Sequence, residues 1–334
     1  MTAVLAFRFT AWGSPPALTE VADPSPADGE VLVRVLAAGA CHSDLHVVDA
    51  APGAFGFTPP FTLGHEIAGE VVPTGDRVAV YGPWGCGECV RCRSGMDNYC
   101  DRRGALGWAG VGLGRDGGMA SHVLVPERYL VPIGDLPATQ AAPLTDAGLT
   151  PYHAIAPLRD RLGPGSAVAV IGIGGLGHLA VQILRAVTPT RVFAVDVREA
   201  ALELAVGAEF TTLVRPDTSS VLRTANGGTG FDAVLDFVGN ESSLALGSAI
   251  LRAAGELVIV GSGGGRLGKG GLPAGARVSL PFWGTRAELG EVVALAREGW
   301  LRVAVEEFPL PAAAEAFTRL RAGGVRGRAV LVPE

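Results

Sequence analysis

An apolar run, a cluster of glycines and a helical pattern follow one another directly in the second half of this chain of 334 residues. Residues 167–171 are continuously apolar, which is typical of a parallel strand that is covered on both faces. After the glycines at 172–177, apolar residues recur at spacings of three and four as far as Val187, which indicates a helix face. Further strand signals follow at 191–195, 233–237 and 257–260. This alternation predicts a doubly wound parallel sheet.

The stretch Gly172-Ile173-Gly174-Gly175-Leu176-Gly177 fits the pattern G-x-G-x-x-G. The pattern is weak alone, but a strand before it and a helix after it favour a dinucleotide site. The three glycines permit a tight turn, a close approach of the backbone to the pyrophosphate, and close packing of helix and strand. Asp196 ends the next strand, where an acid binds the ribose hydroxyls and repels a 2′-phosphate, so NAD is preferred to NADP. The alternative is that the glycines only form a turn and that Asp196 only caps a strand.

Residues 1–150 have a different pattern, with short strand signals at 31–36, 77–80 and 122–125 that are interrupted by Gly and Pro. They predict an irregular β-rich domain whose motifs, at 41–46, 64–66 and 86–100, lie on loops. The tail is expected to hold a helix from about Arg286, a strand at 303–308, a helix around 312–321 and a strand at 328–332. The glycine-dense stretch 262–275 is expected to be a loop.

Composition excludes some classes of partner. The net charge is −6 and the chain has no basic cluster, which argues against nucleic acid and anionic membranes as partners. The start of the chain has no apolar signal-peptide core, and no stretch reaches the roughly 18 apolar residues of a membrane-spanning helix. We therefore expect a cytoplasmic protein, in which the five cysteines serve as metal ligands rather than disulfides.

Four of the five cysteines form the motif Cys86-x2-Cys89-x2-Cys92-x7-Cys100. Thiolates on a short loop supply the four soft ligands of a structural zinc site. The alternatives are an iron–sulfur cluster and a pair of disulfides. The bacterial cluster motif has a shorter last gap and a following Pro, whereas Asp101 follows Cys100 here. A reducing compartment disfavours disulfides, so structural zinc is expected.

The fifth cysteine opens the motif Cys41-His42-Ser43-Asp44-Leu45-His46, and His65 lies in Gly64-His65-Glu66. Taken separately, Cys41 is an ordinary buried thiol and His65 an ordinary hydrogen-bonded histidine. Taken together, and with a dinucleotide site in the same chain, they indicate a second metal site.

At these motifs the sequence resembles the zinc-containing medium-chain dehydrogenase/reductase family, and in particular its bacterial secondary alcohol dehydrogenases. The resemblance runs over nearly the whole chain and includes the four cysteines in order and the nucleotide motif. It implies an α/β fold with a GroES-like catalytic domain at 1–150, a Rossmann domain at 151–285, and a return segment at 286–334 that completes the catalytic domain. It also implies NAD and two zinc ions per chain, one catalytic and one structural.

The stretch 143–150 looks like the family segment that supplies the last protein ligand of the catalytic zinc. Many members have Cys at the place where this chain has Asp146, and some bacterial secondary alcohol dehydrogenases have Asp. The resemblance thus implies Cys41, His65 and Asp146 as ligands. Two anions against one Zn²⁺ keep the formal charge at zero, and zinc accepts a carboxylate. The alternative for Asp146 is a helix cap or turn residue.

Further roles follow from the resemblance and from chemistry. Ser43 would accept a hydrogen bond from the alcohol, His46 would pass its proton to solvent, and Asp44 would orient His65. Glu66 would lie beside the metal as an additional acid or an alternate ligand, and His42 and Arg328 would serve the cofactor's phosphates. For Glu66, His42 and Arg328 the alternative is a solvated surface charge.

Several aromatic residues are candidates for the wall of an apolar substrate cleft, with ordinary core packing as the alternative: Trp84, Phe55, Trp283, Phe57 and Tyr81. The expected reaction is hydride transfer between NAD and a primary or secondary alcohol, or its aldehyde or ketone. A polyol or formaldehyde dehydrogenase of the same family and an inactive zinc- and NAD-binding protein are the rivals. The family also implies a homodimer or homotetramer. This chain departs from the family at Gly69–Gly75, which resembles a trimmed hairpin, and after Asp196, where it is slightly shortened.

Overall fold

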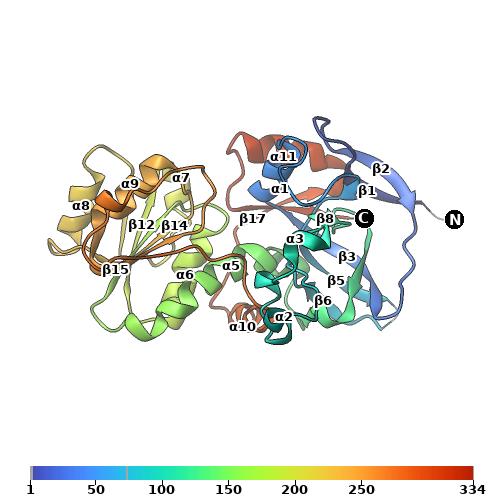
Figure 1. Cartoon of the computed structure of the whole chain (residues 1–334), viewed down its shortest axis with the longest axis horizontal. Coiled ribbons are helices and arrows are strands. Elements are labelled where there is room, and N and C mark those ends of the chain that lie inside the picture. Colours follow the sequence, from blue (N-terminus) through green and yellow to red (C-terminus); the bar gives the residue numbers. More distant parts are fainter. Residues whose placement is uncertain (1–2, 73, 334) are drawn as a thin grey trace. The chain divides into compact units, whose positions relative to one another are not determined.

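The computed structural model describes residues 3–72 and 74–333, and the chain divides into two compact units (Figure 1). The first unit comprises Met1–Leu149, Trp283–Glu298 and Arg302–Glu334, and the second comprises Thr150–Phe282 and Gly299–Leu301. The chain thus leaves the first unit after residue 149 and returns to it at residue 283, while the predicted domain boundaries were placed after residues 150 and 285.

The first unit is built on a seven-stranded sheet with the strand order β10-β6-β5-β3-β18-β17, in which β9 also pairs with β3. A three-stranded sheet, β2-β1-β4, and a short pair, β7-β8, accompany it. The strands are β1 (Ala3–Phe9), β2 (Ala17–Ala22), β3 (Glu30–Ala40), β4 (Phe61–Thr62), β5 (Glu66–Val72), β6 (Arg77–Val80), β7 (Gly110–Val111), β8 (Gly114–Arg115), β9 (His122–Pro126), β10 (Leu130–Pro132), β17 (Val305–Pro309) and β18 (Arg328–Val332). Antiparallel pairs dominate, apart from the parallel pairs β17–β18 and β7–β8.

Alternating burial explains how β3 holds the centre of this sheet. Val33 and Val35 are buried while Arg34 between them is exposed, so one face of the strand meets the core. Beyond Val35 the register against β5 shifts, and residues 37–40 are all buried. The strand therefore ends inside the unit, and Cys41 follows it directly.

The described helices of the first unit are short. They are α1 (His42–Val48), α2 (Val90–Arg93), α3 (Arg103–Leu106), α4 (Ala138–Pro143), α10 (Arg286–Arg297) and α11 (Ala313–Arg321), with the 3-10 turns η1 (Asp97–Tyr99), η2 (Glu127–Tyr129) and η6 (Leu310–Ala312). After α4 the chain continues into a π-helical turn, η3 (Leu144–Gly148), which contains Asp146. Such turns are rare and occur frequently at functional sites.

The expectation that the metal motifs lie on loops is wrong for parts of all three. In the first motif, residues 42–46 lie in α1. In the second, Glu66 opens β5, and in the third, Cys92 lies in α2. The reason for α1 is local, because the Asp44 side chain accepts a hydrogen bond from the Cys41 N–H and so satisfies a donor at the helix start.

The second unit contains a six-stranded parallel sheet with the order β13-β12-β11-β14-β15-β16. Its elements are β11 (Ala167–Ile171), β12 (Arg191–Asp196), β13 (Phe210–Leu213), β14 (Phe231–Asp236), β15 (Leu251–Ile259), β16 (Arg277–Ser279), α5 (Leu149–Ile155), η4 (Ala156–Arg161), α6 (Gly177–Val187), α7 (Glu199–Leu202), α8 (Thr218–Ala225), α9 (Glu241–Ile250) and η5 (Lys269–Gly271). The predicted parallel sheet is therefore confirmed. The strand order reverses between β11 and β14, and ligands bind at such a switch point in open α/β sheets.

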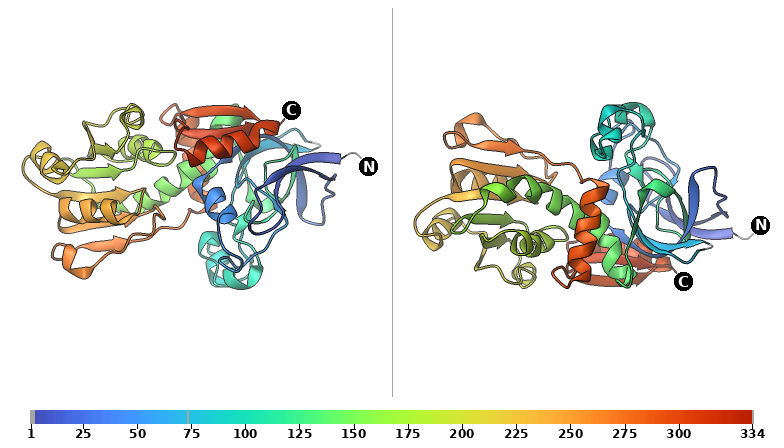
Figure 2. Two further views of the ribbon diagram at one scale, coloured as in Figure 1. Left: turned by 90° about the horizontal axis from the view of Figure 1, so that it is seen from above. Right: turned by 90° about the horizontal axis from the view of Figure 1, so that it is seen from below.

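Helices cover both faces of this sheet. Helices α8 and α9 lie side by side on one face, and α6 packs against β11 and β12 on the other (Figures 1 and 2). Buried residues of β11, β12 and β14, including Ile171, Phe193 and Phe231, fill the space beneath the helices. Among the described residues, no helix has the length and apolar character needed to cross a membrane.

The predicted tail is also confirmed. Helix α10 begins at Arg286, α11 covers 313–321, and β18 covers 328–332. The strand expected at 303–308 is observed as β17 at 305–309. Of the shortened segment Gly69–Gly75, residues 69–72 belong to β5 and Gly75 lies shortly before β6, while Pro73 lies outside the described residues.

Candidate active site and dinucleotide site

Three side chains from separate parts of the first unit converge. Cys41 Sγ lies 3.5 Å from Asp146 Oδ2, and His65 Nε2 lies 3.8 Å from the same oxygen. The three ligand atoms all lie within 4.8 Å of one another. In a tetrahedral zinc site with ordinary bond lengths, a sulfur and an oxygen ligand are about 3.5 Å apart and a nitrogen and an oxygen ligand about 3.4 Å apart. The donor set and its spacing therefore fit zinc.

Asp44 orients the His65 ring. Asp44 Oδ1 lies 3.1 Å from His65 Nδ1, and its other oxygen, Oδ2, accepts the Cys41 N–H at 2.8 Å. A carboxylate against one ring nitrogen fixes the ring so that the other nitrogen can bind a metal. Burial by itself would lower the pKa of His65, but the neighbouring carboxylates of Asp44 and Asp146 raise it above its ordinary value. Asp44 thus lies beside His65, and its role toward a metal-binding histidine stays a prediction.

Behind these ligands lies a buried network of charges. Arg328 donates from Nε to Glu66 Oε2 at 2.8 Å, and from Nη2 both to Glu66 Oε1 and, at 3.1 Å, to Asp146 Oδ2. The Ala147 N–H donates to Glu66 Oε1 at 3.1 Å. Burial raises the pKa of Glu66, and the Arg328 guanidinium opposes that rise. Because Glu66 is 0% and Arg328 3% exposed, the alternative of a solvated surface charge is wrong for both.

No sequence pattern indicated the contact between Arg328 and Asp146, but one glycine could have indicated the buried carboxylate of Glu66. A Cβ at Gly39 would lie 1.8 Å from Glu66 Oε2, so the strand opposite Glu66 requires a residue without a side chain. Gly39 pairs with Glu66 across β3 and β5. A glycine inside a strand often marks such a close approach.

The polar residues of α1 face outward. His42, Ser43 and His46 are exposed, and Ser43 Oγ lies 3.5 Å from Cys41 Sγ. Ser43 is therefore next to a candidate metal ligand and accessible to a substrate. His46 lies one helical turn further along the same helix. The predicted role of His42 toward a cofactor phosphate stays a prediction.

The aromatic candidates for a substrate wall have different surroundings. Trp283 is buried, and its ring meets the His65 ring edge to face at 5.5 Å. Trp84 stacks on Tyr129 and donates its indole N–H to the Tyr81 carbonyl, as a core residue does. Phe55 is 37% exposed and stacks on Phe57. Of these side chains, Trp283 is the one in contact with a candidate metal ligand.

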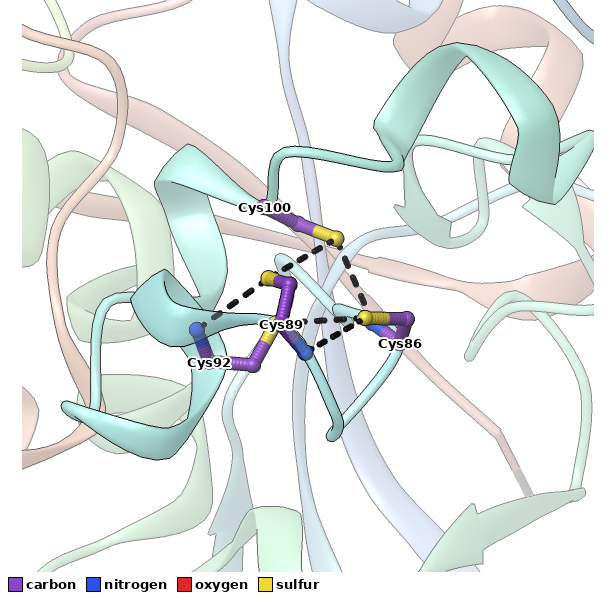
Figure 3. A group of neighbouring side chains, drawn as sticks. All are labelled: Cys86, Cys89, Cys92 and Cys100. Carbon is purple, nitrogen blue, oxygen red and sulfur yellow. Dashed lines mark hydrogen bonds between the residues drawn. The ribbon is translucent and has the colours of Figure 1, made fainter.

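The other four cysteines form a compact lobe, in which their side chains turn toward a common centre (Figure 3). The Sγ atoms of Cys86 and Cys92 are 3.9 Å apart, and those of Cys89 and Cys100 are 4.0 Å apart. Four sulfurs around a tetrahedral zinc ion would be about 3.8 Å apart. Backbone N–H groups of Cys89 and Glu88 lower the pKa of the Cys86 thiol to about 6, which favours the thiolate that binds metals. These residues also fit zinc.

In the second unit, the glycine loop joins β11 to α6 at the switch point of the sheet. Gly172 has a φ of +89°, and a Cβ at Gly177 would lie 1.8 Å from the Gly172 carbonyl oxygen. A Cβ at Gly174 would have no atom within 4 Å, so the loop has open space on that side. The first and third glycines are therefore required for the turn and for packing, and the second leaves room for a ligand.

Asp196 ends β12 beside this loop. Its Oδ2 accepts the Ile173 N–H at 2.7 Å, and its Oδ1 accepts the Arg198 N–H at 2.9 Å. The carboxylate is thereby held at the carboxyl edge of the sheet, next to the predicted pyrophosphate loop. Its role toward a ribose stays a prediction.

Comparisons with known proteins agree with this arrangement. Residues 27–135 match the alcohol dehydrogenase GroES-like domain, and residues 175–295 match the zinc-binding dehydrogenase domain. The chain is 36% identical to an NAD-dependent alcohol dehydrogenase of Sulfurisphaera tokodaii, over 98% of this chain and 99% of that protein.

Two solved structures are similar to the whole chain. The alcohol dehydrogenase of Aeropyrum pernix has a TM-score of 0.89 and 33% identity, covering 98% of this chain and 100% of that one. The acetophenone reductase of Geotrichum candidum, solved in complex with NAD, has a TM-score of 0.86 and 32% identity, covering 99% and 97%.

Proposed function

The chain belongs to the zinc-binding alcohol dehydrogenase family, and we propose that it transfers a hydride between NAD and a primary or secondary alcohol, or the corresponding aldehyde or ketone. The observation that carries the proposal is the convergence of Cys41 Sγ, His65 Nε2 and Asp146 Oδ2 within one buried cluster. Three protein ligands leave the fourth position of a tetrahedral zinc ion for substrate, which is the arrangement of catalytic zinc sites.

Each chain would hold two zinc ions, one at Cys41, His65 and Asp146 and one at the four-cysteine lobe. When bound at the three-residue site, zinc supplies a Lewis acid that polarises the oxygen of the substrate and makes an alcohol easier to deprotonate. The four-cysteine site offers no position for substrate and would stabilise its own loop.

Other residues of this chain would bind the hydroxyl, transfer its proton and hold the metal ligands. Ser43, exposed and next to Cys41, accepts the hydrogen bond of the alcohol hydroxyl. His46, exposed on the same helix, passes the proton to solvent. Asp44 keeps the His65 ring oriented, and Glu66 and Arg328 hold Asp146 in place.

NAD would bind in the second unit, with its pyrophosphate at Gly172–Gly177 and the start of α6. The open space at Gly174 supports a close approach of the backbone to the phosphates. Asp196 would accept hydrogen bonds from the adenosine ribose, and its negative charge favours NAD over NADP. His42 is a further candidate for a contact with the phosphates, whereas the buried Arg328 donates to Glu66 and Asp146 instead.

The substrate class follows from the aromatic residues. The exposed Phe55 would offer apolar surface to a substrate, which favours small apolar alcohols and ketones over polyols. The chain would also assemble into a homodimer or homotetramer. Strand β16 is an edge strand, and the exposed Val278 and Leu280 at this edge supply apolar surface for pairing with a second copy.

The test is to measure zinc per chain on the purified protein and NADH formation from NAD with a panel of 2-alkanols and sorbitol. Two zinc ions per chain with NADH formation from 2-alkanols is the expected result. Strong activity on sorbitol with none on 2-alkanols would favour a polyol dehydrogenase. One zinc ion and no turnover would contradict the proposed catalytic site and leave only the four-cysteine site.

A further inference from the structure

The backbone of Trp283 is strained. Its φ is +55°, in the left-handed region that a bulky residue rarely adopts, although its side chain is buried in the core of the first unit. Such a conformation persists only where the surroundings determine it, and it occurs most often at functional sites. The contacts of the indole ring show what holds Trp283 in this conformation.

The indole N–H donates to the backbone carbonyl of Thr145 at 2.9 Å, which is the residue directly before Asp146. In an α-helix this carbonyl would accept the N–H of Leu149. In the π-helical turn the Leu149 N–H is directed instead to the carbonyls of Leu144 and Asp146. The Thr145 carbonyl therefore does not receive the Leu149 N–H, and the Trp283 indole N–H donates to it.

The indole ring also contacts His65 on one side and fills the space beside Gly82 on another. Its plane meets the His65 ring edge to face at 5.5 Å and 84°. On another side a Cβ at Gly82 would lie 2.3 Å from Trp283 Cζ2, so the indole fills the space that a side chain at position 82 would need. One side chain thus contacts a candidate ligand and the turn that carries another.

We propose that Trp283 is a positioning residue of the metal site, whose indole N–H holds the π-helical turn in the register that directs Asp146 toward Cys41 and His65. The proposal rests on the proposed function, because it takes these three residues as metal ligands. Trp283 has no part in binding the metal directly.

The experiment compares Co²⁺ binding to the full chain of the wild type, Trp283→Phe and Trp84→Phe. Trp283→Phe keeps an aromatic ring but removes the N–H. Trp84→Phe is the matched control, since it removes another buried indole N–H that donates to a backbone carbonyl of the first unit. Visible absorption reports the ligand geometry around Co²⁺, and competition with a chelator gives its affinity. Cys41→Ala supplies the spectrum of the four-cysteine site alone.

We expect Trp283→Phe to weaken Co²⁺ binding at the three-residue site about tenfold or more, as loss of a group that orients a ligand does, and to change its absorption bands. Trp84→Phe should match the wild type at this site. If Trp283→Phe binds Co²⁺ with the affinity and spectrum of the wild type, the positioning role is wrong. If the wild type itself binds Co²⁺ only at the four cysteines, the metal assignment fails instead, so the two failures are distinct.

A second variant keeps the test decisive if Trp283→Phe does not fold. Gly82→Ala leaves the indole intact but places a methyl group against its ring, which must move. The same loss of Co²⁺ affinity at the three-residue site is expected. Unchanged affinity in a folded Gly82→Ala protein would count against the proposal.

Discussion

The four cysteines of the lobe lie within 14 positions of one another, whereas Cys41 and Asp146 are 105 positions apart in the sequence. The lobe is supported by its own backbone N–H groups, which donate to the sulfurs of Cys86, Cys89 and Cys100. The three-residue cluster is supported instead by side chains from other elements, namely Asp44, Glu66 and Arg328. The four-cysteine site, whose ligands are close in the sequence, thus depends on a short loop. The three-residue site, whose ligands are far apart in the sequence, depends on the fold of the whole unit.

The two clusters also differ in charge. Four thiolates around Zn²⁺ carry a formal charge of −2, whereas one thiolate, one carboxylate and a neutral histidine cancel it. Arginines lie at positions 91, 93, 102 and 103, within or next to the cysteine motif, and those at 91, 93 and 102 are exposed to solvent. In the three-residue cluster the one buried cation, among the described residues around it, is Arg328, which is itself paired with Glu66. The lobe is therefore suited to stability, and the neutral cluster to binding a substrate oxygen.

The largest difference should appear when one ligand of each cluster is removed. Cys41→Ala should lower kcat by about 10⁴-fold, since a metal-assisted step loses its Lewis acid, while the zinc of the lobe is retained. Cys86→Ala should instead lose the zinc of the lobe and lower the thermal midpoint, with turnover of the folded protein largely kept. Zinc analysis, initial rates of NADH formation and thermal scans on both variants check this. Unchanged turnover in Cys41→Ala would refute the assignment of the catalytic site.

The next effect concerns the buried charges that support the three-residue cluster. Glu66→Ala leaves Arg328 buried without the carboxylate that accepts two of its hydrogen bonds, and should destabilise the protein by about 3–5 kcal/mol. Glu70→Ala, in the same strand, is the matched control. Its partner Arg34 is half exposed, so the expected loss is about 0–1 kcal/mol. Urea unfolding measures the free energy of unfolding of both variants. Equal losses would show that the buried pair Glu66–Arg328 contributes no more to stability than the exposed pair.

A smaller effect is expected where a carboxylate acts on the metal through a histidine. Asp44→Asn keeps the size of the side chain but removes the charge that faces His65 Nδ1, and should weaken zinc binding at the three-residue cluster by about tenfold to a hundredfold. Asp49→Asn, at the exposed end of the same helix, should leave zinc affinity unchanged. Chelator competition gives both affinities. No difference between the two variants would mean that Asp44 serves only as a helix cap for Cys41.

This contrast also explains what the sequence could predict. The cysteine spacing was sufficient for the lobe because its ligands and their supports are local. The parallel sheet was predictable as well, since its strands are continuous apolar runs that follow one another along the chain. Asp146 could be identified as a ligand only through the family resemblance, because no local sequence pattern distinguishes a metal-binding acid in a turn from any other. The pairing of Arg328 with Glu66 spans 262 positions, and no periodicity connects them. The indole bond of Trp283 depends on a π-helical turn that no sequence pattern indicated.

The smallest effect should come from the surface of the lobe. Arg102 donates to Glu88 at 2.6 Å, but their side chains are 57% and 73% exposed, so solvent screens the pair. Arg102→Gln should therefore leave the zinc content and the thermal midpoint unchanged, although it removes a cation beside four thiolates. Zinc analysis and thermal scans against the wild type are the measurements. A loss of zinc in this variant would show that the lobe depends on compensation by side-chain charge, as the three-residue cluster does. The distinction between a site supported by its own loop and a site supported by a charge network would then be wrong.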